Sequence, residues 1–277
     1  MVRPRGRARG RRRAGLAIVP PMETLRVERA DGVVTVTMDR PERKNAINET
    51  MWVELWETFE AVARSSEDRV LVVTGAGGAF CSGQDLGGVS DAGDHGLVRM
   101  RRVGDVALAL HRSPKPTIAK VEGIAAGAGC NLALGCDLIV ASEDARFSEI
   151  FSRRGLSVDF GGSWVLPRLI GLHRAKELAF FAEIVSAKEA ADIGLVNRVV
   201  PTAEIDTFVD GWARTLAAGP PLALSMTKTL LNNGLATSME QAVEDEARCQ
   251  ALNFSTADTV EAVQAFSQKR EPNFRGA

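Results

Sequence analysis

Apolar and polar positions alternate along the first two thirds of the chain in patterns that change from segment to segment. Residues 23–29 and 33–38 mix polar and apolar side chains in a strand-like pattern, and the Ala-Asp-Gly between them favours a tight turn, so together they predict a β-hairpin. Residues 48–64 carry apolar side chains at helical spacing, with Asn48 as a suitable N-cap. Residues 70–74 are largely apolar, which is typical of a strand buried on both faces.

The alternation of strand-like and helical segments continues to about residue 141. The further elements that we expect are a mobile loop at 87–95, helices at 97–111 and 131–135, and strands at 117–121 and 137–141. Repeated strand–turn–helix alternation predicts an α/β fold. From about residue 203 the periodicity is helical to the end, so we divide the chain into a core at 22–202 and a C-terminal helical region at 203–277.

Composition is that of an ordinary globular protein, with 45% hydrophobic and 25% charged residues among 277. No apolar run approaches the roughly 20 residues of a membrane-spanning helix, so we expect no membrane association. The four cysteines show no C-x-x-C spacing, and the three histidines lie beside no nucleophile motif. We therefore expect reduced thiols, no metal site and a cytoplasmic location.

Charge is distributed unevenly between the start of the chain and the rest. Residues 1–22 contain seven arginines and no acid, so the net charge of −1 combines +7 from this segment with −8 from the remainder. The segment could be a nucleic-acid-binding tail, a targeting peptide or the result of an early start codon, since Met22 directly precedes the first strand. We favour a disordered extension at 1–21. Its arginines are not interleaved with aromatic residues, so nucleic acid is not an expected partner.

Two glycine-rich turns share one design, in which an apolar strand leads into small residues and then into a helical start. Residues 70–74 lead to Phe80–Asp85, and residues 117–121 lead to Ala126–Cys130. Small side chains allow close approach to the backbone, and a helix N-terminus leaves N–H groups unpaired. Either turn alone is explained by tight packing, but two side by side could bind one oxygen that develops negative charge. Neither has the complete G-x-G-x-x-G spacing of a dinucleotide site.

These turns belong to an ordered set of motifs that resembles the crotonase (enoyl-CoA hydratase/isomerase) superfamily over about residues 22–275. The motifs are DRPERKNA (39–46), FCSGQD (80–85), GIAAGAG (123–129), GLSVDFGG (155–162) and KREPNF (269–274). Within the superfamily they are most similar to the ring-epoxide isomerases of phenylacetyl-CoA catabolism. The resemblance implies a spiral of ββα units that assembles as trimers, often paired into hexamers. Acyl-CoA would be the substrate, with no separate cofactor.

The resemblance also implies roles for particular residues. The backbone N–H groups of Gln84 and Ala128 would form an oxyanion hole for the thioester carbonyl. Positions along the CoA channel correspond to Arg43, Lys44, Ser82, Asp85 and Leu86, and C-terminal positions that close the site, sometimes across a subunit boundary, correspond to Phe266 and Lys269.

The acid–base residues depart from the pattern of the hydratases, which use two glutamates. Those two positions are occupied by Asn131 and Phe151, and Glu149 comes two residues early, so we expect it to lie elsewhere. Asp159 is the remaining candidate, because burial between apolar neighbours would raise its pKa toward a useful range. An aspartate before Phe-Gly-Gly is equally typical of a turn or an N-cap. Its match to the aspartate of the isomerases favours catalysis.

A single carboxylate suits a double-bond shift, in which one group removes a proton and returns it two carbons away. The leading hypothesis is therefore isomerisation of an enoyl-CoA with Asp159 as the proton shuttle. A hydratase that uses Asp159 and a water oriented by Asn131 is the main alternative. A third hypothesis is a catalytically weak homologue that binds acyl-CoA or RNA.

Overall fold

A computed structural model describes residues 22–88 and 95–277. Our expectations for the basic segment 1–21 and for most of the loop at 87–95 lie outside the described residues. The expected β-hairpin is confirmed: β1 (Leu25–Ala30) and β2 (Val33–Met38) pair antiparallel, with Ala30 opposite Val33.

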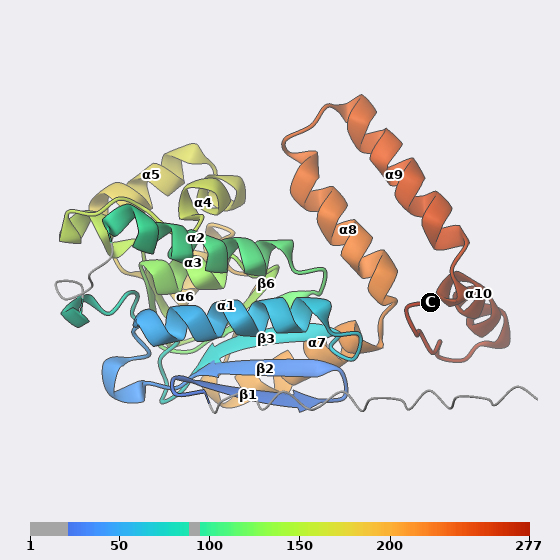
Figure 1. Ribbon diagram of the computed structural model, residues 1–277, viewed down its shortest axis with the longest axis horizontal. Helices are drawn as coiled ribbons and strands as arrows, with labels where there is room; N and C mark the ends of the chain where they lie inside the picture. Colours follow the sequence, from blue (N-terminus) through green and yellow to red (C-terminus); the bar gives the residue numbers. More distant parts are fainter. Residues whose placement is uncertain (1–21, 89–94) are drawn as a thin grey trace, which may run out of the picture.

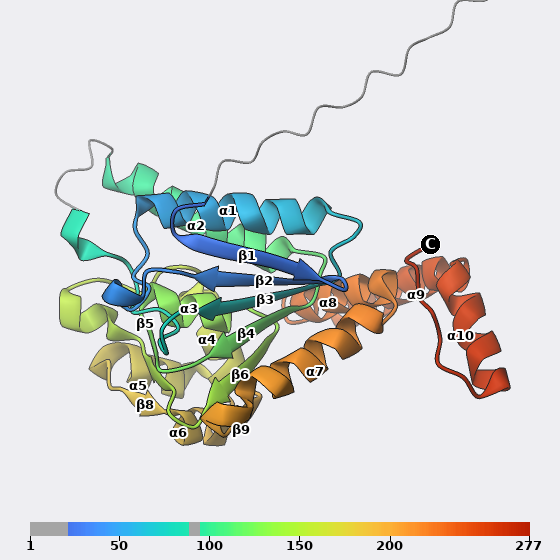
Figure 2. The ribbon, with the colours of Figure 1, turned by 90° about the horizontal axis from the view of Figure 1, so that it is seen from below.

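Six strands form the main sheet in the order β1-β2-β3-β4-β6-β9, and all pairs after the hairpin are parallel (Figure 2). Its further strands are β3 (Val70–Gly75), β4 (Thr117–Val121), β6 (Leu138–Ser142) and β9 (Arg198–Val200). A smaller sheet lies beyond the ends of these strands, in the order β5 (Ile124–Ala126), β7 (Arg146–Ser148) and β8 (Val185–Ser186). The predicted α/β class is thereby confirmed.

Both faces of the main sheet are covered, as the apolar run of β3 predicts. Leu71 and Val73 face the large core under α1 (Glu49–Arg64) and α2 (Gly96–Arg112). Val70 and Val72 face a second cluster under α7 (Ile205–Ala218). The predicted cap of α1 is present, because the Asn48 side chain accepts a hydrogen bond from the Met51 N–H at 2.9 Å.

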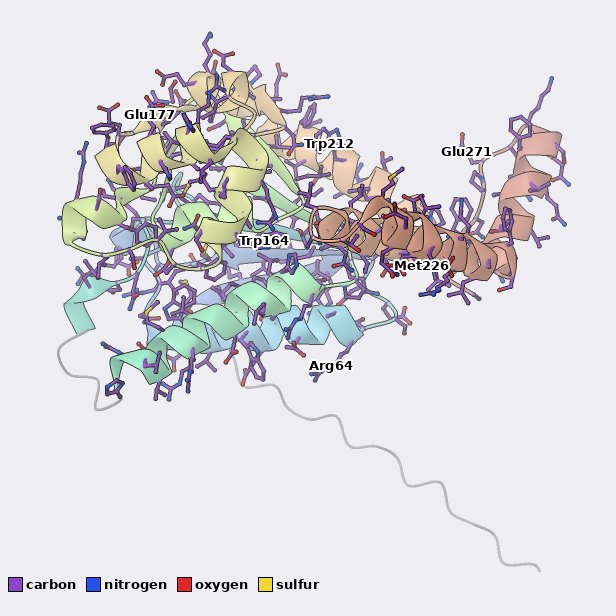
Figure 3. The ribbon with its side chains drawn as sticks, turned by 90° about the horizontal axis from the view of Figure 1, so that it is seen from above. Arg64, Trp164, Glu177, Trp212, Met226 and Glu271 are labelled. Carbon is purple, nitrogen blue, oxygen red and sulfur yellow. The ribbon has the colours of Figure 1, made fainter. Side chains whose placement is uncertain are left out.

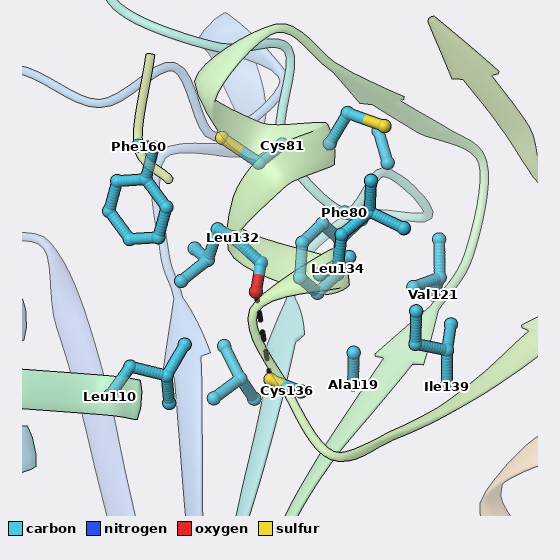
Figure 4. Packing of buried hydrophobic residues seen from close by; sticks show 14 of the residues in the cluster. Phe80, Cys81, Leu110, Ala119, Val121, Leu132, Leu134, Cys136, Ile139 and Phe160 are labelled. Carbon is cyan, nitrogen blue, oxygen red and sulfur yellow. Dashed lines mark hydrogen bonds between the residues drawn. The ribbon is translucent and has the colours of Figure 1, made fainter. Parts of the chain in front are cut away.

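The short helix α3 (Ala128–Leu134) lies inside the molecule, and all seven of its residues are buried. Figure 4 shows Leu132 and Leu134 packed among Phe80, Val121 and Ile139 of the surrounding strands and turns. Around this core lie the helices α4 (Gly162–Ile170), α5 (Leu172–Phe181) and α6 (Ala187–Asp192), and the 3₁₀ turns η1 (Pro41–Arg43), η2 (Leu86–Gly88), η3 (Ile150–Arg154) and η4 (Thr202–Glu204). Because α3 is buried on every side, the packing around it holds the backbone of its first residue, Ala128, in place.

The C-terminal region is helical, as predicted, and three of its helices project from the body (Figure 1). We call α8 (Pro221–Gly234), α9 (Met239–Phe254) and α10 (Ala257–Gln268) the arm. In Figure 3, Met226 and Glu271 mark the arm, away from Trp164 in the body. The arm is attached through α8, where Lys228 Nζ lies 2.8 Å from Asp137 Oδ2. Within residues 22–88 and 95–277 no helix is both long and apolar enough to span a membrane.

Candidate active site

The two glycine-rich turns lie against each other. The Cys81 N–H donates to the Ile124 carbonyl, and the Ala126 N–H donates to the Cys81 carbonyl, each at 2.9 Å. Gly83 has a φ of 100°, and a Cβ there would lie 2.9 Å from the Ala126 oxygen. The same position is 3.8 Å from the Ala128 nitrogen. Glycine is therefore required at position 83, both for the backbone conformation and for this close approach.

The two candidate oxyanion donors occur at this junction. Within the described residues, neither the Gln84 N–H nor the Ala128 N–H donates to a protein acceptor. Ala128 is the first residue of α3. The N–H group at the first position of a helix has no intrahelical acceptor. Gln84 is fixed by its neighbours, because the Ile47 N–H donates to the Gly83 carbonyl and the Asp85 N–H to the Ile47 carbonyl, both at 2.8 Å.

Two details of the predicted turn design are wrong. Directly after the first turn, the residues that the structure describes up to 88 form the 3₁₀ turn η2 and not an α-helix. After the second turn the helix begins at Ala128 rather than at Asn131. The early start has a physical cause: Gly127, with a φ of 54°, reverses the chain directly after β5, which lets α3 begin at the next residue.

Both turns open into a cavity of about 290 Å³. Its lining brings together Gln84, Ala128 and Asp159, three of the four predicted catalytic residues. The other lining residues are Ser82, Gly83, Leu86, Gly127, Ile150, Phe151, Arg154 and Leu156. Asp159 is the one carboxylate among these described residues. The arrangement places two unpaired backbone donors and one potential base around the same space.

Asp159 is held by its backbone, which leaves its carboxylate available. Its carbonyl oxygen accepts from the Gly162 N–H at 2.9 Å and from Asn131 Nδ2 at 3.0 Å. The next residue, Phe160, has a φ of 50° and stacks its ring on Trp52 of α1 with centroids 5.6 Å apart. The N-cap of α4 is Gly161, so the Asp159 side chain does not cap that helix. Burial raises the pKa of Asp159 to about 6.

Asn131 and Glu149 form a polar pair behind the cavity lining. Asn131 is 1% exposed, and its Nδ2 donates to Glu149 Oε2 at 3.3 Å. As expected from its position two residues early, Glu149 is not part of the described cavity lining, but it lies directly behind that lining against Asn131. The reason is that Glu149 directly follows β7, and its side chain is buried against α3, whereas the next two residues line the cavity. Burial, with a further contribution from the charge of Asp159, raises the pKa of Glu149 to about 7.

Arg154 was not anticipated from the sequence, although it lines the cavity and is exposed to solvent. The signal that could have indicated it is the pair Arg153-Arg154, which stands directly before the GLSVDFGG motif. Phe151, at the second glutamate position of the hydratases, also lines the cavity. The described lining therefore carries an apolar ring and a cation beside the carboxylate of Asp159.

Of the predicted CoA-channel residues, Ser82 and Leu86 belong to the described cavity lining. Arg43 and Lys44 are exposed, and both contact Ser82, whose hydroxyl donates to the Arg43 carbonyl at 3.1 Å and whose N–H donates to the Lys44 carbonyl at 3.0 Å. Leu86 is an exposed apolar member of the lining. Asp85 differs, because its carboxylate binds Arg40 at 3.0 Å and is engaged within the turn.

The C-terminal candidates are not brought to the cavity of their own chain. Phe266 lies on α10 with 88% of its surface exposed, and Lys269 is the C-cap of the same helix. Neither contributes to the described lining. In Figure 1 the arm holds α10 away from the body, so any role of these residues at a cavity requires a second copy of the chain.

Cysteine and histidine chemistry has no support at this site. Burial raises the pKa of Cys81 to about 12, and burial together with Glu149 raises that of Cys130 well above its ordinary value. His111 packs edge-on against Trp164, and burial lowers its pKa. His95 is the N-cap of α2, and its Nδ1 accepts a hydrogen bond from the Leu97 N–H.

The fold and this cavity define an α/β enzyme of the crotonase class, with a buried helix N-terminus beside a glycine-rich turn. The family model for "Enoyl-CoA hydratase/isomerase" matches residues 28–277, and the chain belongs to this family. A Rhodobacter capsulatus protein named "Probable enoyl-CoA hydratase" is 40% identical over 91% of this chain and 98% of its own length. The 1,2-epoxyphenylacetyl-CoA isomerase of Escherichia coli K12 is 38% identical over 88% and 95%. An enoyl-CoA hydratase structure from Bacillus anthracis is 30% identical, with a TM-score of 0.88 over 92% of this chain and 100% of that one.

Proposed function

We propose that this enzyme isomerises the double bond of an enoyl-CoA thioester, with Asp159 as the proton shuttle. The supporting observation is the cavity that Gln84, Ala128 and Asp159 line together. The thioester carbonyl would accept hydrogen bonds from the N–H groups of Gln84 and Ala128, which have no acceptor among the described residues. Preorganised donors of this kind stabilise charge that develops on an oxygen, because they need no reorganisation during the reaction.

The proton transfer follows from the environment of Asp159. Its carboxylate removes a proton from C2 of a 3-enoyl thioester, and the electron pair moves into a dienolate whose oxygen is held by the two N–H groups. The same carboxyl group then returns the proton to C4, which leaves the 2-enoyl isomer. A pKa of about 6 suits both steps, since the group is mostly ionised at neutral pH and still basic enough to accept a proton.

Hydration is the second candidate, and the polar pair behind the lining is the observation that favours it. Asn131 and Glu149 lie next to Asp159, and relatives of this chain are named hydratases. In this variant Asp159 would activate a water that Asn131 orients. The apolar Phe151 argues for isomerisation, because it occupies the second glutamate position of the hydratases.

Product analysis distinguishes the two reactions. The enzyme is incubated with short 2-enoyl-CoA and 3-enoyl-CoA in H₂¹⁸O, the products are separated by reversed-phase chromatography against isomer standards, and their ¹⁸O content is measured by mass spectrometry. Isomerisation gives the shifted double bond without ¹⁸O, whereas hydration gives a labelled 3-hydroxyacyl product.

We expect Asp159→Asn to lower the isomerisation kcat by about 10²–10⁴-fold, because the amide cannot accept the proton. Asp144→Asn, at an exposed carboxylate that binds Thr202, serves as the matched control. Full turnover of Asp159→Asn on the preferred substrate would remove the shuttle role.

The remaining parts of the proposal concern CoA and assembly. Arg43 and Lys44 are exposed cations next to Ser82, and we place the CoA phosphates on this side of the cavity. The exposed apolar side chains of the arm support a homotrimer or hexamer, in which Phe266 and Lys269 of one copy would close the cavity of another. Sedimentation velocity at micromolar concentration tests the assembly.

A further inference from the structure

The side-chain amide of Asn131 joins two carboxylate residues. Its Nδ2 donates to Glu149 Oε2 at 3.3 Å and to the Asp159 carbonyl oxygen at 3.0 Å. Glu149 is 2% exposed and is not part of the cavity lining, so it does not touch a ligand held there. Any influence of Glu149 on the reaction must therefore act through its neighbours.

Asn131 packs directly against the backbone at the start of α4. A Cβ on Gly162, the first residue of α4, would lie 2.4 Å from both the Nδ2 and the Oδ1 of Asn131. The amide is thus held between Glu149 and the backbone of α4, at a place where only glycine fits. The two hydrogen bonds of the Asn131 amide therefore connect Glu149 with the Asp159 segment.

The cluster contains more acceptors than donors. Three buried oxygens have no hydrogen-bond partner among the described residues: Glu149 Oε1, Asn131 Oδ1 and Asp159 Oδ1. Buried acceptors without donors are unfavourable, and a proton on one carboxyl group supplies a missing donor. Glu149 is the more deeply buried carboxylate of the two, which makes it the natural holder of that proton.

We propose that Glu149 is a positioning residue that sets the proton affinity of Asp159 across the Asn131 amide, an inference that rests on the proposed role of Asp159. The described ionisable groups that change the pKa of Glu149 are the Cys130 thiol on α3 and the Asp159 carboxylate before α4, and neither is a cation. When Glu149 loses its proton, its negative charge disfavours the Asp159 carboxylate. Asp159 then becomes a stronger base.

This coupling makes a specific prediction for the pH dependence of turnover. The pKa of Asp159 is about 6 and that of Glu149 about 7, so the two groups titrate as a coupled pair. We expect kcat to rise in two steps, the first as Asp159 ionises and the second as Glu149 ionises. The second step lies at the higher pH because burial, with a smaller contribution from the charge of Asp159, raises the pKa of Glu149 to about 7.

The test measures kcat and KM for isomerisation from pH 5 to pH 9 in the wild-type enzyme and in Glu149→Gln. Glutamine has the shape of protonated Glu149 but cannot ionise. We expect equal kcat within about twofold at pH 6, a variant kcat about three- to tenfold lower at pH 8, and an unchanged KM. Glu149→Asp, which keeps a titratable group, is expected to retain the second step.

Glu54→Gln is the matched control, because Glu54 is a buried carboxylate that binds the Thr24 N–H away from the cavity. It should leave the shape of the pH profile unchanged. A Glu149→Gln profile that is scaled by one factor at every pH, or a changed KM, would show that Glu149 is structural and would overturn the proposal. Glu149→Met provides a second non-ionisable variant if the glutamine variant does not fold. Failure of the shuttle itself would be recognised separately, as full turnover of Asp159→Asn.

Discussion

The body and the arm differ in how they hold their apolar residues. In the body, every residue of α3 is buried, and the sheet is covered on both faces. In the arm, none of the residues of α8 or α9 is buried. The exposed large apolar side chains of the arm are Leu222, Leu231, Leu235, Met239, Val243, Leu252, Phe254, Val260, Val263 and Phe266. An apolar surface of this extent is typical of a protein–protein contact.

The difference in burial suggests different roles for the two regions: the body holds the candidate site, and the arm would form contacts between copies. The body holds the candidate donors and the carboxylate by its own packing, because α3 is enclosed and Phe160 is anchored on Trp52. The arm contributes nothing to the cavity lining of its own chain. Substitutions in the body should therefore change the chemical step, whereas substitutions on the arm should change assembly and substrate binding.

Next to the loss of the Asp159 carboxylate, the largest effect is expected from removing one backbone donor in the body. Ala128→Pro deletes the N–H at the first position of α3, where proline is well tolerated because this N–H has no helical partner. If the amide stabilises an oxyanion, kcat falls by about 10²–10³-fold. Steady-state kinetics with circular dichroism measures the loss and verifies the fold.

A matched control is Met239→Pro, at the first position of α9. It makes the same change of residue class at a helix start far from the cavity, and kcat should remain unchanged. An Ala128→Pro enzyme that is folded and fully active would show that the body does not use this amide, and the oxyanion hole would have to be abandoned.

Much of the body was predictable from sequence because its signals are local. The strand at 117–121 and the Asn48 cap follow from apolar runs and from the chemistry of one side chain. The position of Glu149 was not predictable, because it depends on how β7 directs the chain beneath α3. Helical periodicity predicted the C-terminal helices. It could not show that α8 to α10 project from the body. Whether the apolar face of a helix is exposed depends on its tertiary contacts and not on the spacing of apolar residues along the sequence.

An intermediate effect is expected from a charge on the arm. Val263 on α10 is 66% exposed in the single chain, and Val263→Asp would place a carboxylate in the proposed contact between copies. We expect the assembly to dissociate in sedimentation velocity, with KM for acyl-CoA about tenfold higher and kcat reduced less. Val53→Asp, at an exposed valine on α1, is the control for adding the same charge to the body. If both variants sediment alike, the distinction between arm and body does not extend to assembly.

The smallest effect concerns the stability of the body and its dependence on pH. Burial raises the pKa of Asp159 from 3.8 to about 6, so the ionised group destabilises the folded state at any pH above that range. As pH falls through 6 the folded state binds the proton first and this cost disappears. Asp159→Asn should therefore increase the free energy of unfolding by about 1–3 kcal/mol at pH 8 and change it little at pH 4.

Substitution of Asp85 is expected to change the free energy of unfolding in the opposite direction and serves as the comparison for Asp159. Hydrogen bonds from the Gly87 N–H and from Arg40 lower the pKa of Asp85, so its carboxylate stabilises the fold at neutral pH and loses that effect in acid. Asp85→Asn should lower the unfolding midpoint in urea at pH 8, whereas Asp159→Asn raises it. The opposite signs follow from position: Asp85 is bound within its turn, and Asp159 faces the cavity without a donor among the described residues. Equal signs for the two variants would contradict the view that the body tolerates an unfavourable carboxylate for the sake of its chemistry.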